Sequence, residues 1–422
     1  MPRSPWELAD VLRRYGAAFR QMAHATLSLT QTRVMTAIEA CRTAALGGHV
    51  DVCDGCGFTS VSYNACRNRH CPKCQGAARL AWLAERESEL LPVAYFHVVF
   101  TVPSAVAELA LFNKRCLYEI LFKTASQSLL RLAEDPKRLG ARIGFLAILH
   151  TWGRNLLHHP HVHCVVPGGG LSKDRTRWIT TRKPGYLLSV EALSSLFRGK
   201  VTAELKSAFD AGKLSLPSSL SPLAERGAFE LFLSRLRSQP WVVYCKPPFG
   251  GPQQVLRYLG RYTHRVALSN DSILSIDDGK VSFRFKDYRD GNRVKVMTLD
   301  ATEFIRRFLL HVLPGGFQRI RHYGFLANRS RQRSITLCRR LISEAQAAAG
   351  DQGLLSTPAA PSFDSQPATD SSPAPRPCPV CQTPLRTLEL PPTRVPAQPI
   401  NLAEPAAITA PSRASPACAA AA

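Results

Sequence analysis

The chain has 422 residues, which at roughly 150 residues per domain predicts two or three folded units. Apolar residues make up 45% of it, enough to bury a core and to exclude a protein that is disordered throughout. Lysine and arginine number 54 against 31 acidic residues, a net charge of +23, so phosphate groups are the first partners to consider. The alternative is a basic surface that only keeps the protein in solution.

The sequence predicts no membrane span and no secretory signal. The nearest candidate for a span, residues 90–107, contains Pro92, His97 and Pro103 and instead predicts a buried strand with its flanks. The N-terminus carries acids and arginines without an apolar segment. We therefore expect a protein of the bacterial cytoplasm that does not act at membranes. Its 13 cysteines should then be metal ligands or buried thiols, because disulfides are rare there.

Residues 1–90 are predicted to be helical at both ends and rich in cysteine in the middle. Two pairs with the spacing Cys-x2-Cys lie fourteen residues apart, and each can place two thiolates on one metal ion from a tight turn. The sequence therefore predicts one structural zinc ion on Cys53, Cys56, Cys71 and Cys74. Four neighbours could replace a ligand or build a second site: His49, Cys66, His70 and Cys41.

Basic residues run through the second cysteine pair of this module. Arg67, Arg69 and Lys73 could offer DNA phosphates a rigid basic edge, or could form an ordinary solvated face.

From residue 91 the pattern predicts alternating strands and helices. Residues 95–102 form a β-branched and aromatic strand, residues 105–134 a helix, residues 144–149 an apolar strand and residues 161–166 another strand. In the last of these, His161 and His163 point to the same face, because strand side chains alternate, and could bind one metal ion together. The third ligand is left open among four candidates: Gln254, His264, His158 and His159.

Residues 172–240 are more polar and less periodic, which indicates an insertion, and residues 241–246 return to a strand. Pro252 then suits the first turn of a helix on which Tyr258 and Tyr262 are spaced i, i+4. On a helical wheel Tyr262 falls in the apolar stripe, whereas Tyr258 falls at its edge beside Gln254, Arg261 and Arg265. A tyrosine phenol there can attack a phosphodiester, helped by a divalent ion on the histidines.

The remaining chain contains a predicted hairpin and a tail. Residues 272–285 form two strands around the turn signal Asp278-Gly279. Residues 346–422 are predicted to be a mostly disordered tail, since the last 72 residues hold 15 of the 31 prolines. Within the tail, Cys378 and Cys381 form half of a zinc site, which alone is insufficient to bind the ion.

Four segments occur in order: CRNRHCPKC, HPHVHCVVPGGGL, YLGRYTHRVALSN and RIRHYGFLANR. In combination they resemble the two-tyrosine HUH transposases of rolling-circle bacterial insertion sequences, the IS91 type, over roughly residues 25 to 345. The resemblance implies an α+β fold. It comprises an HUH nuclease domain at residues 91–345, with a central antiparallel sheet and flanking helices, a zinc-ribbon-like module within residues 1–90, and the tail.

The resemblance also implies chemistry. His161 and His163 match the HUH pair, which would hold Mg²⁺ or Mn²⁺, and Tyr258 and Tyr262 match the two nucleophiles, which raises Tyr262 to a second nucleophile. The DNA partners would be the single-stranded ends of the mobile element and the target site, with Arg257, Arg261 and Arg265 close to the phosphates. Because the sequence has no nucleotide-binding loop of the helicase type, strand separation would come from the host replication or helicase machinery.

Two other readings remain open on the residues. One is a nucleotidyl hydrolase with a histidine nucleophile, because residues 159–163 also fit an H-x-H-x-H pattern. The other is a zinc-ribbon DNA-binding protein without catalysis, in which the histidines and tyrosines only pack. A covalent protein-DNA adduct would distinguish the transposase from both.

Overall fold

The computed structural model describes residues 4–153, 155–246, 254, 260, 267–287, 290–291, 293–348 and 376–393. At its centre lies a five-stranded antiparallel sheet with the strand order β12-β4-β5-β3-β8. Its strands are β3 (Tyr95–Thr101), β4 (Gly144–Trp152), β5 (His158–Pro167), β8 (Val243–Lys246) and β12 (Ile320–Gly324). The expected α+β fold with a central antiparallel sheet is therefore confirmed. Among the described residues, none of the helices combines the length and the hydropathy needed to cross a lipid bilayer.

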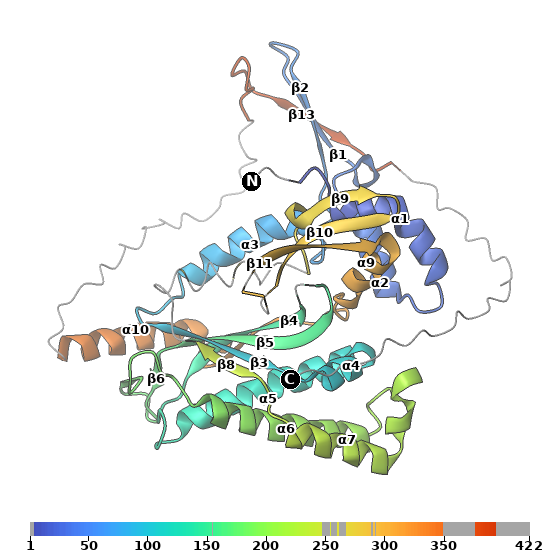
Figure 1. Ribbon diagram of the computed structural model, residues 1–422. Coiled ribbons are helices and arrows are strands. Elements are labelled where there is room, and N and C mark those ends of the chain that lie inside the picture. Colours follow the sequence, from blue (N-terminus) through green and yellow to red (C-terminus); the bar gives the residue numbers. More distant parts are fainter. Residues whose placement is uncertain are drawn as a thin grey trace.

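Helices cover one face of this sheet (Figure 1). They are α4 (Ser104–Phe112), α5 (Lys114–Glu134), α6 (Val190–Asp210) and α7 (Arg226–Ser238). Phe100 of β3 and Phe197 of α6 are fully buried in the core between them, and each such ring contributes about 1.5–3 kcal/mol of transfer free energy. Residues 172–240, expected to be a polar insertion, thus supply two helices of the main core, because their apolar residues gather on single faces.

The helix expected over residues 105–134 is interrupted at Asn113. The Asn113 side chain donates hydrogen bonds to the carbonyls of Leu109 and Ser215, at 3.0 and 2.8 Å, and accepts one from the Ser215 N–H at 2.7 Å. The break between α4 and α5 is therefore stabilised by Ser215, which is 102 residues away in the sequence. The local sequence around Asn113 does not predict this contact.

The opposite face of the sheet is covered by α3 (Pro72–Glu87), whose Trp82 packs with Leu146 and Ile148 of β4. At one end, α10 (Arg331–Ala348) packs on the hairpin of β6 (Gly169–Leu171) and β7 (Trp178–Thr180). Because strand side chains alternate, His150 of β4 and His161 and His163 of β5 lie on the same face as Leu146 and Ile148, which is the α3 side.

A second core joins distant parts of the chain. Its helices are α1 (Leu8–Met22), α2 (Leu29–Glu39) and α9 (Ala301–Leu310), and its strands are β9 (Ile273–Asp277), β10 (Lys280–Asp287) and β11 (Arg293–Asp300). The expected hairpin is confirmed, with Asp278 and Gly279 at φ values of 47° and 72° in its turn. The N-terminal helices thus share their core with residues 268–312.

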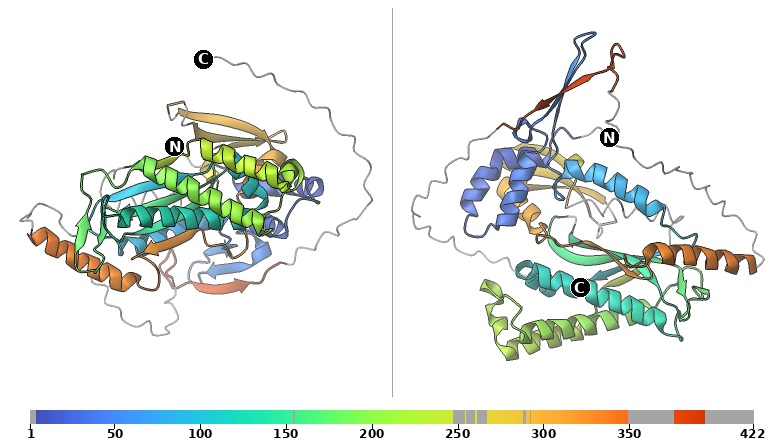
Figure 2. Two further views of the ribbon diagram at one scale, coloured as in Figure 1. Left: turned by 90° about the horizontal axis from the view of Figure 1, so that it is seen from below. Right: turned by 180° about the vertical axis from the view of Figure 1, so that it is seen from behind.

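A third sheet has the order β13-β1-β2, from β1 (Gly48–Val52), β2 (Thr59–Tyr63) and β13 (Arg386–Leu390). Figure 2 shows this sheet projecting from the body of the molecule, with the strand of residues 386–390 beside the N-terminal hairpin. The expectation of a disordered tail is therefore wrong for residues 376–393. Main-chain pairing to β1 orders this segment, and composition alone does not reveal that partner.

Candidate functional site

Three histidines form a cluster on the central sheet. His161 and His163 lie on the same face of β5, as expected, and His150 of β4 stands opposite His161 in the strand register. The ring centroids of His150 and His163 are 4.2 Å apart, and those of His161 and His163 are 4.8 Å apart. One ligating nitrogen from each of the three lies within 4.8 Å of the others, a spacing that suits one shared metal ion.

The surroundings of the cluster favour the neutral form of His161 and His163. Burial lowers the pKa of His161 to about 4 and holds that of His163 well below its usual value. The His161 Nδ1 donates to the carbonyl of His159 at 2.6 Å, which leaves Nε2 as the atom with a free lone pair. The His163 Nδ1 shares a hydrogen bond of 2.7 Å with the Nε2 of His97. Neutral, oriented imidazoles are the form in which histidine binds metal ions, so this donor set fits a divalent cation.

The third member of the cluster is His150, which the sequence reasoning did not consider. Gln254 is helical and exposed, and His264 lies outside the described residues. His158 is committed elsewhere, because its Nδ1 donates to the carbonyl of Ala107 at 3.0 Å and its Nε2 accepts from the Tyr118 hydroxyl at 2.9 Å. The only sequence signal for His150 is its position at the end of the apolar strand 144–149, in the same alternation as Leu146 and Ile148.

The expected tyrosine helix lies largely outside the described residues, which exclude Tyr258, Tyr262, Arg257, Arg261 and Arg265. Gly260, between the two tyrosines, is described as helical and buried. A Cβ placed on it would lie 2.6 Å from the Cδ2 of Leu83 in α3, so a larger residue here would require the Leu83 side chain to move. This point of the chain therefore packs on the helix that covers the histidine face of the sheet.

The cysteines form two clusters of four. The first joins Cys41, Cys66, Cys71 and Cys74, and its Sγ atoms are 3.6 Å apart for Cys41 and Cys74 and for Cys66 and Cys74. Four thiolates at about 2.3 Å from one zinc ion stand roughly 3.8 Å from each other, so the donor set and spacing fit structural zinc. A closed set of four cysteines leaves no position for catalysis.

The second cluster joins Cys53 and Cys56 to Cys378 and Cys381. Its Sγ atoms are 3.3 Å apart for Cys53 and Cys381, and 3.7 Å apart for Cys56 and Cys378. The sequence-based grouping of both N-terminal pairs on a single ion is therefore wrong. Cys71 and Cys74 are completed by Cys41 and Cys66, whereas Cys53 and Cys56 are completed by two cysteines more than three hundred residues away. Local spacing cannot show which pairs meet.

Two histidines near the cysteines take no part in these clusters. His70 is buried, and its Nε2 accepts the N–H of Leu313 at 3.2 Å while its Nδ1 bonds Asn68 Oδ1 at 3.1 Å. His49 lies on β1, opposite Ser62 of β2. His70 therefore joins the loop before α3 to the chain that follows α9.

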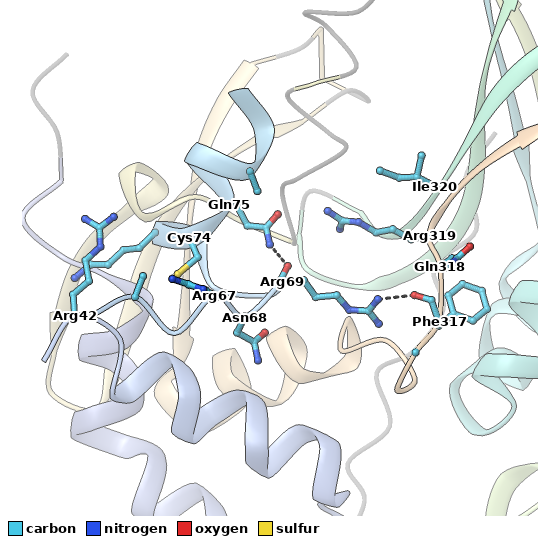
Figure 3. Close-up of a pocket in the computed structure, with 14 residues that line it drawn as sticks. Arg42, Arg67, Asn68, Arg69, Cys74, Gln75, Phe317, Gln318, Arg319 and Ile320 are labelled. Atoms are coloured by element: carbon cyan, nitrogen blue, oxygen red, sulfur yellow. Dashed lines mark hydrogen bonds between the residues drawn. The ribbon is translucent and has the colours of Figure 1, made fainter. Parts of the chain in front are cut away.

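A basic cleft of about 760 Å³ lies between the start of α3 and the chain that leads into β12 (Figure 3). Five cations line it, and none of the described residues that line it is acidic: Arg42, Arg67, Arg69, Lys73 and Arg319. Burial, and to a smaller extent the nearby charge of Arg69, lower the pKa of Arg319 to about 10. The Leu149 N–H donates to the Arg319 carbonyl at 2.8 Å, so this wall of the cleft adjoins the strand that carries His150.

The three cations expected to contact DNA differ in their surroundings. Arg69 donates to the carbonyls of Phe317 and Pro314 at 2.5 and 3.0 Å, and Lys73 pairs with Glu7 at 2.5 Å. Arg67 is exposed, and no described residue pairs with its guanidinium.

Two protein-family models match the chain. Residues 144–334 match one described as "Putative transposase", and residues 11–102 match one described as "Transposase zinc-binding domain". The zinc-binding model includes the whole of the first cysteine cluster but only Cys53 and Cys56 of the second. The transposase model includes all three clustered histidines.

Among curated proteins, "Putative transposase y4qJ" of Sinorhizobium fredii is 58% identical over 342 residues, which cover 81% of this chain and 85% of that protein. "Transposase for insertion sequence element IS801" of Pseudomonas savastanoi pv. phaseolicola is 28% identical and covers 71% of each chain.

Among solved structures, the metal-bound conjugative relaxase TrwC in complex with oriT DNA is 11% identical, covering 40% of this chain and 71% of that one, with a TM-score of 0.23. TrwC complexed with a 27-mer DNA is 12% identical, covering 59% and 72%, with a TM-score of 0.22. Scores this low carry no conclusion about function.

Proposed function

This chain belongs to the IS91-type family of transposases, and we propose that it cuts and rejoins single-stranded DNA at its histidine cluster during rolling-circle transposition. The observation that carries the proposal is the group formed by the buried His150 and His163 and the half-buried His161 on the face of the sheet that adjoins a basic cleft. Neutral imidazoles supply a metal site, and the cleft supplies positive charge for phosphates.

In the proposed reaction a tyrosine phenol oxygen attacks the scissile phosphorus. The new bond holds the 5′-phosphate on the protein, the bond to the 3′-oxygen breaks, and that oxygen takes up a proton to leave a free 3′-hydroxyl. The reverse attack by another 3′-hydroxyl rejoins the strands, so that no ATP is needed. A bound Mg²⁺ or Mn²⁺ would polarise the phosphate and stabilise its developing charge.

The residues around the ligands have positioning roles in this proposal. His97 holds the ring of His163 through its 2.7 Å hydrogen bond, and the carbonyl of His159 holds that of His161. Such bonds to the second ring nitrogen hold the ring orientation of both histidines, and the carbonyl acceptor also fixes the tautomer of His161, which therefore presents Nε2.

The basic cleft is proposed to hold the DNA backbone beside the histidines. Arg69 and Arg319 both carry positive charge within it; burial is the main cause of the lowered pKa of Arg319, and repulsion from Arg69 adds to it. A phosphate placed between them would relieve this repulsion and form charge-assisted hydrogen bonds. Arg67, at the exposed rim, is the cation of this set that is most accessible to an entering strand. Opening of the DNA duplex is assigned to host replication or helicase machinery.

We assign the first nucleophile to Tyr258 and the second to Tyr262. The support is the wheel, which places Tyr258 at the polar edge, and the contact of Gly260 with Leu83 of α3, the helix over the histidine face. Rolling-circle exchange needs two successive cleavages, and a second phenol could act while the first still holds DNA. The arginines of this segment, Arg257, Arg261 and Arg265, are proposed to contact the phosphates.

The test is the covalent adduct between the protein and an oligonucleotide that carries one end of the element. Tyr258→Phe should abolish the adduct, because it removes the nucleophilic oxygen and keeps the ring. Tyr262→Phe should retain it at least partly but fail in transposition in cells. Tyr186→Phe, at an exposed tyrosine between β7 and α6, is the control and should behave as wild type. Peptide mapping that finds the adduct at residue 262 alone would reverse the order, and finding no adduct with wild type would refute the proposal.

A further inference from the structure

The two cysteine pairs of the second cluster share one local geometry. In each, the carbonyl of the first cysteine accepts the N–H four residues later, and its N–H donates to the carbonyl five residues later, at 2.8 to 3.0 Å. The residue after the second cysteine has a positive φ in both, 74° at Gly57 and 63° at Gln382. Two matching turns with four convergent thiols are the construction of a zinc ribbon.

Main-chain pairing extends this match into the strands. β13 pairs with β1 from Gly48 opposite Leu390 to Val52 opposite Arg386. The buried carboxylate of Asp51 accepts from Arg376 and from the Thr387 hydroxyl, both at 2.7 Å. The C-terminal segment is therefore held in one register, with polar partners on both sides of the turn.

We propose that a second zinc ion, on Cys53, Cys56, Cys378 and Cys381, fastens the C-terminal segment onto the N-terminal hairpin. The zinc-binding family model ends at residue 102 and the transposase model at residue 334, so neither includes Cys378 or Cys381. The four ligands come together only when residues 376–393 pair with the N-terminal hairpin.

Metal is required because this sheet has little else to stabilise it. In β13 four of the five side chains are exposed, and in the part of the chain that the structure describes, none of the large hydrophobic clusters includes residues 376–393. A small sheet without a core folds when a metal ion supplies the missing free energy. The four-cysteine donor set, in two turns of matching geometry, is the one that structural zinc prefers.

The experiment compares zinc content in the full chain, by native mass spectrometry, between wild type and Cys378→Ser/Cys381→Ser. The double variant should bind one zinc ion fewer per chain. Cys116→Ser, at a half-buried cysteine outside both clusters, is the matched control and should keep the wild-type count. Equal zinc content in the double variant and wild type would overturn the proposal, as would a wild-type mass that reveals a disulfide among these cysteines.

Hydrogen exchange on the same proteins tests the fastening itself. The double variant should lose amide protection in β13 and β1, whereas β3 and β5 of the central sheet should exchange as in wild type and so report that the body is folded. Loss of zinc with β13 still protected would overturn the role of the metal. Faster exchange in β3 and β5 as well would overturn the claim that the zinc ion acts only on this sheet.

Discussion

At the scale of single residues, His150 is expected to be as necessary to the metal site as the two histidines of β5. It stands opposite His161 across the β4–β5 ladder and 4.2 Å from the ring of His163. His150→Ala should weaken Mn²⁺ binding and adduct formation, each by on the order of 100-fold, because two imidazoles remain where three converged. Titration with Mn²⁺, followed by calorimetry, measures the first effect and the oligonucleotide assay the second.

The control is His49→Ala, a histidine on β1 that belongs to none of the metal-ligating groups of the described residues. It should bind Mn²⁺ as wild type does. Wild-type Mn²⁺ affinity in His150→Ala would mean that the ion, if bound, is held by other groups, with Gln254 and His264 as the alternatives.

The residue-level predictions succeeded where local geometry is sufficient. Alternation along a strand places His161 and His163 on one face whatever the rest of the chain does. It says nothing of His150, because that residue becomes a neighbour only through the pairing register of β4 with β5. The cysteines repeat this lesson, since the spacing identifies each pair and the fold decides which pairs meet.

At the scale of elements, α3 connects the first cysteine cluster to the central sheet. Its first turn carries Cys74 and lines the basic cleft, and its later turns pack Trp82 on the sheet and Leu83 against Gly260. Zinc on the first cluster would therefore set the position of the cleft relative to the histidines. The break between α4 and α5 at Asn113 is another feature at this scale. Contacts between residues far apart in the sequence determine both this break and the packing of α3.

The cleft yields a prediction on salt dependence. Arg42→Gln/Arg67→Gln should weaken binding of single-stranded DNA and reduce the slope of log affinity against log salt by about 1 to 2, because two phosphate contacts are lost. Both side chains are exposed, so the fold should be unaffected. Fluorescence anisotropy with a labelled oligonucleotide over a range of salt concentrations gives the slope.

The matched control for this variant is Arg235→Gln/Arg237→Gln on α7, which removes two exposed cations from the outer helical layer. It changes the net charge equally but should leave the slope near the wild-type value. If both double variants reduce the slope alike, then net charge explains the binding and the cleft does not.

At the scale of the whole molecule, segments that lie far apart in the sequence pack against each other, and composition does not reveal these contacts. The N-terminal helices share a core with residues 268–312, and the C-terminal segment returns to the hairpin of residues 48–63. The sequence predicts the fold class and most strands, because hydrophobic alternation is local. It does not reveal the order of residues 376–393 or the core helices within residues 172–240, because their partners are distant.

Three histidines that are not members of the cluster connect different parts of the chain, and they should make stability depend on pH. Burial lowers the pKa of His70 to about 3, of His158 to about 4 and of His311 to about 3, against an ordinary value of 6.5. Between these values the unfolded chain binds protons that the folded chain excludes. Their contribution to stability is therefore complete above pH 6.5 and is lost progressively as the pH falls towards 4, by on the order of 1 kcal/mol per pH unit for each site.

Acid would also release zinc from the cysteine clusters by protonating the thiolates that bind it, so the histidine contribution must be isolated by difference. His311, which bonds the Leu156 carbonyl at 3.1 Å, joins α9 to the loop before β5, and His311→Gln removes one titrating site without altering a cysteine. Urea unfolding at several pH values from 7.5 to 4.5 should give a shallower fall in the free energy of unfolding for the variant than for wild type. The difference should be about 1 kcal/mol per pH unit below 6.5, whatever the stability of the variant at neutral pH. Parallel curves would show that His311 takes up its proton in the folded state as readily as in the unfolded one.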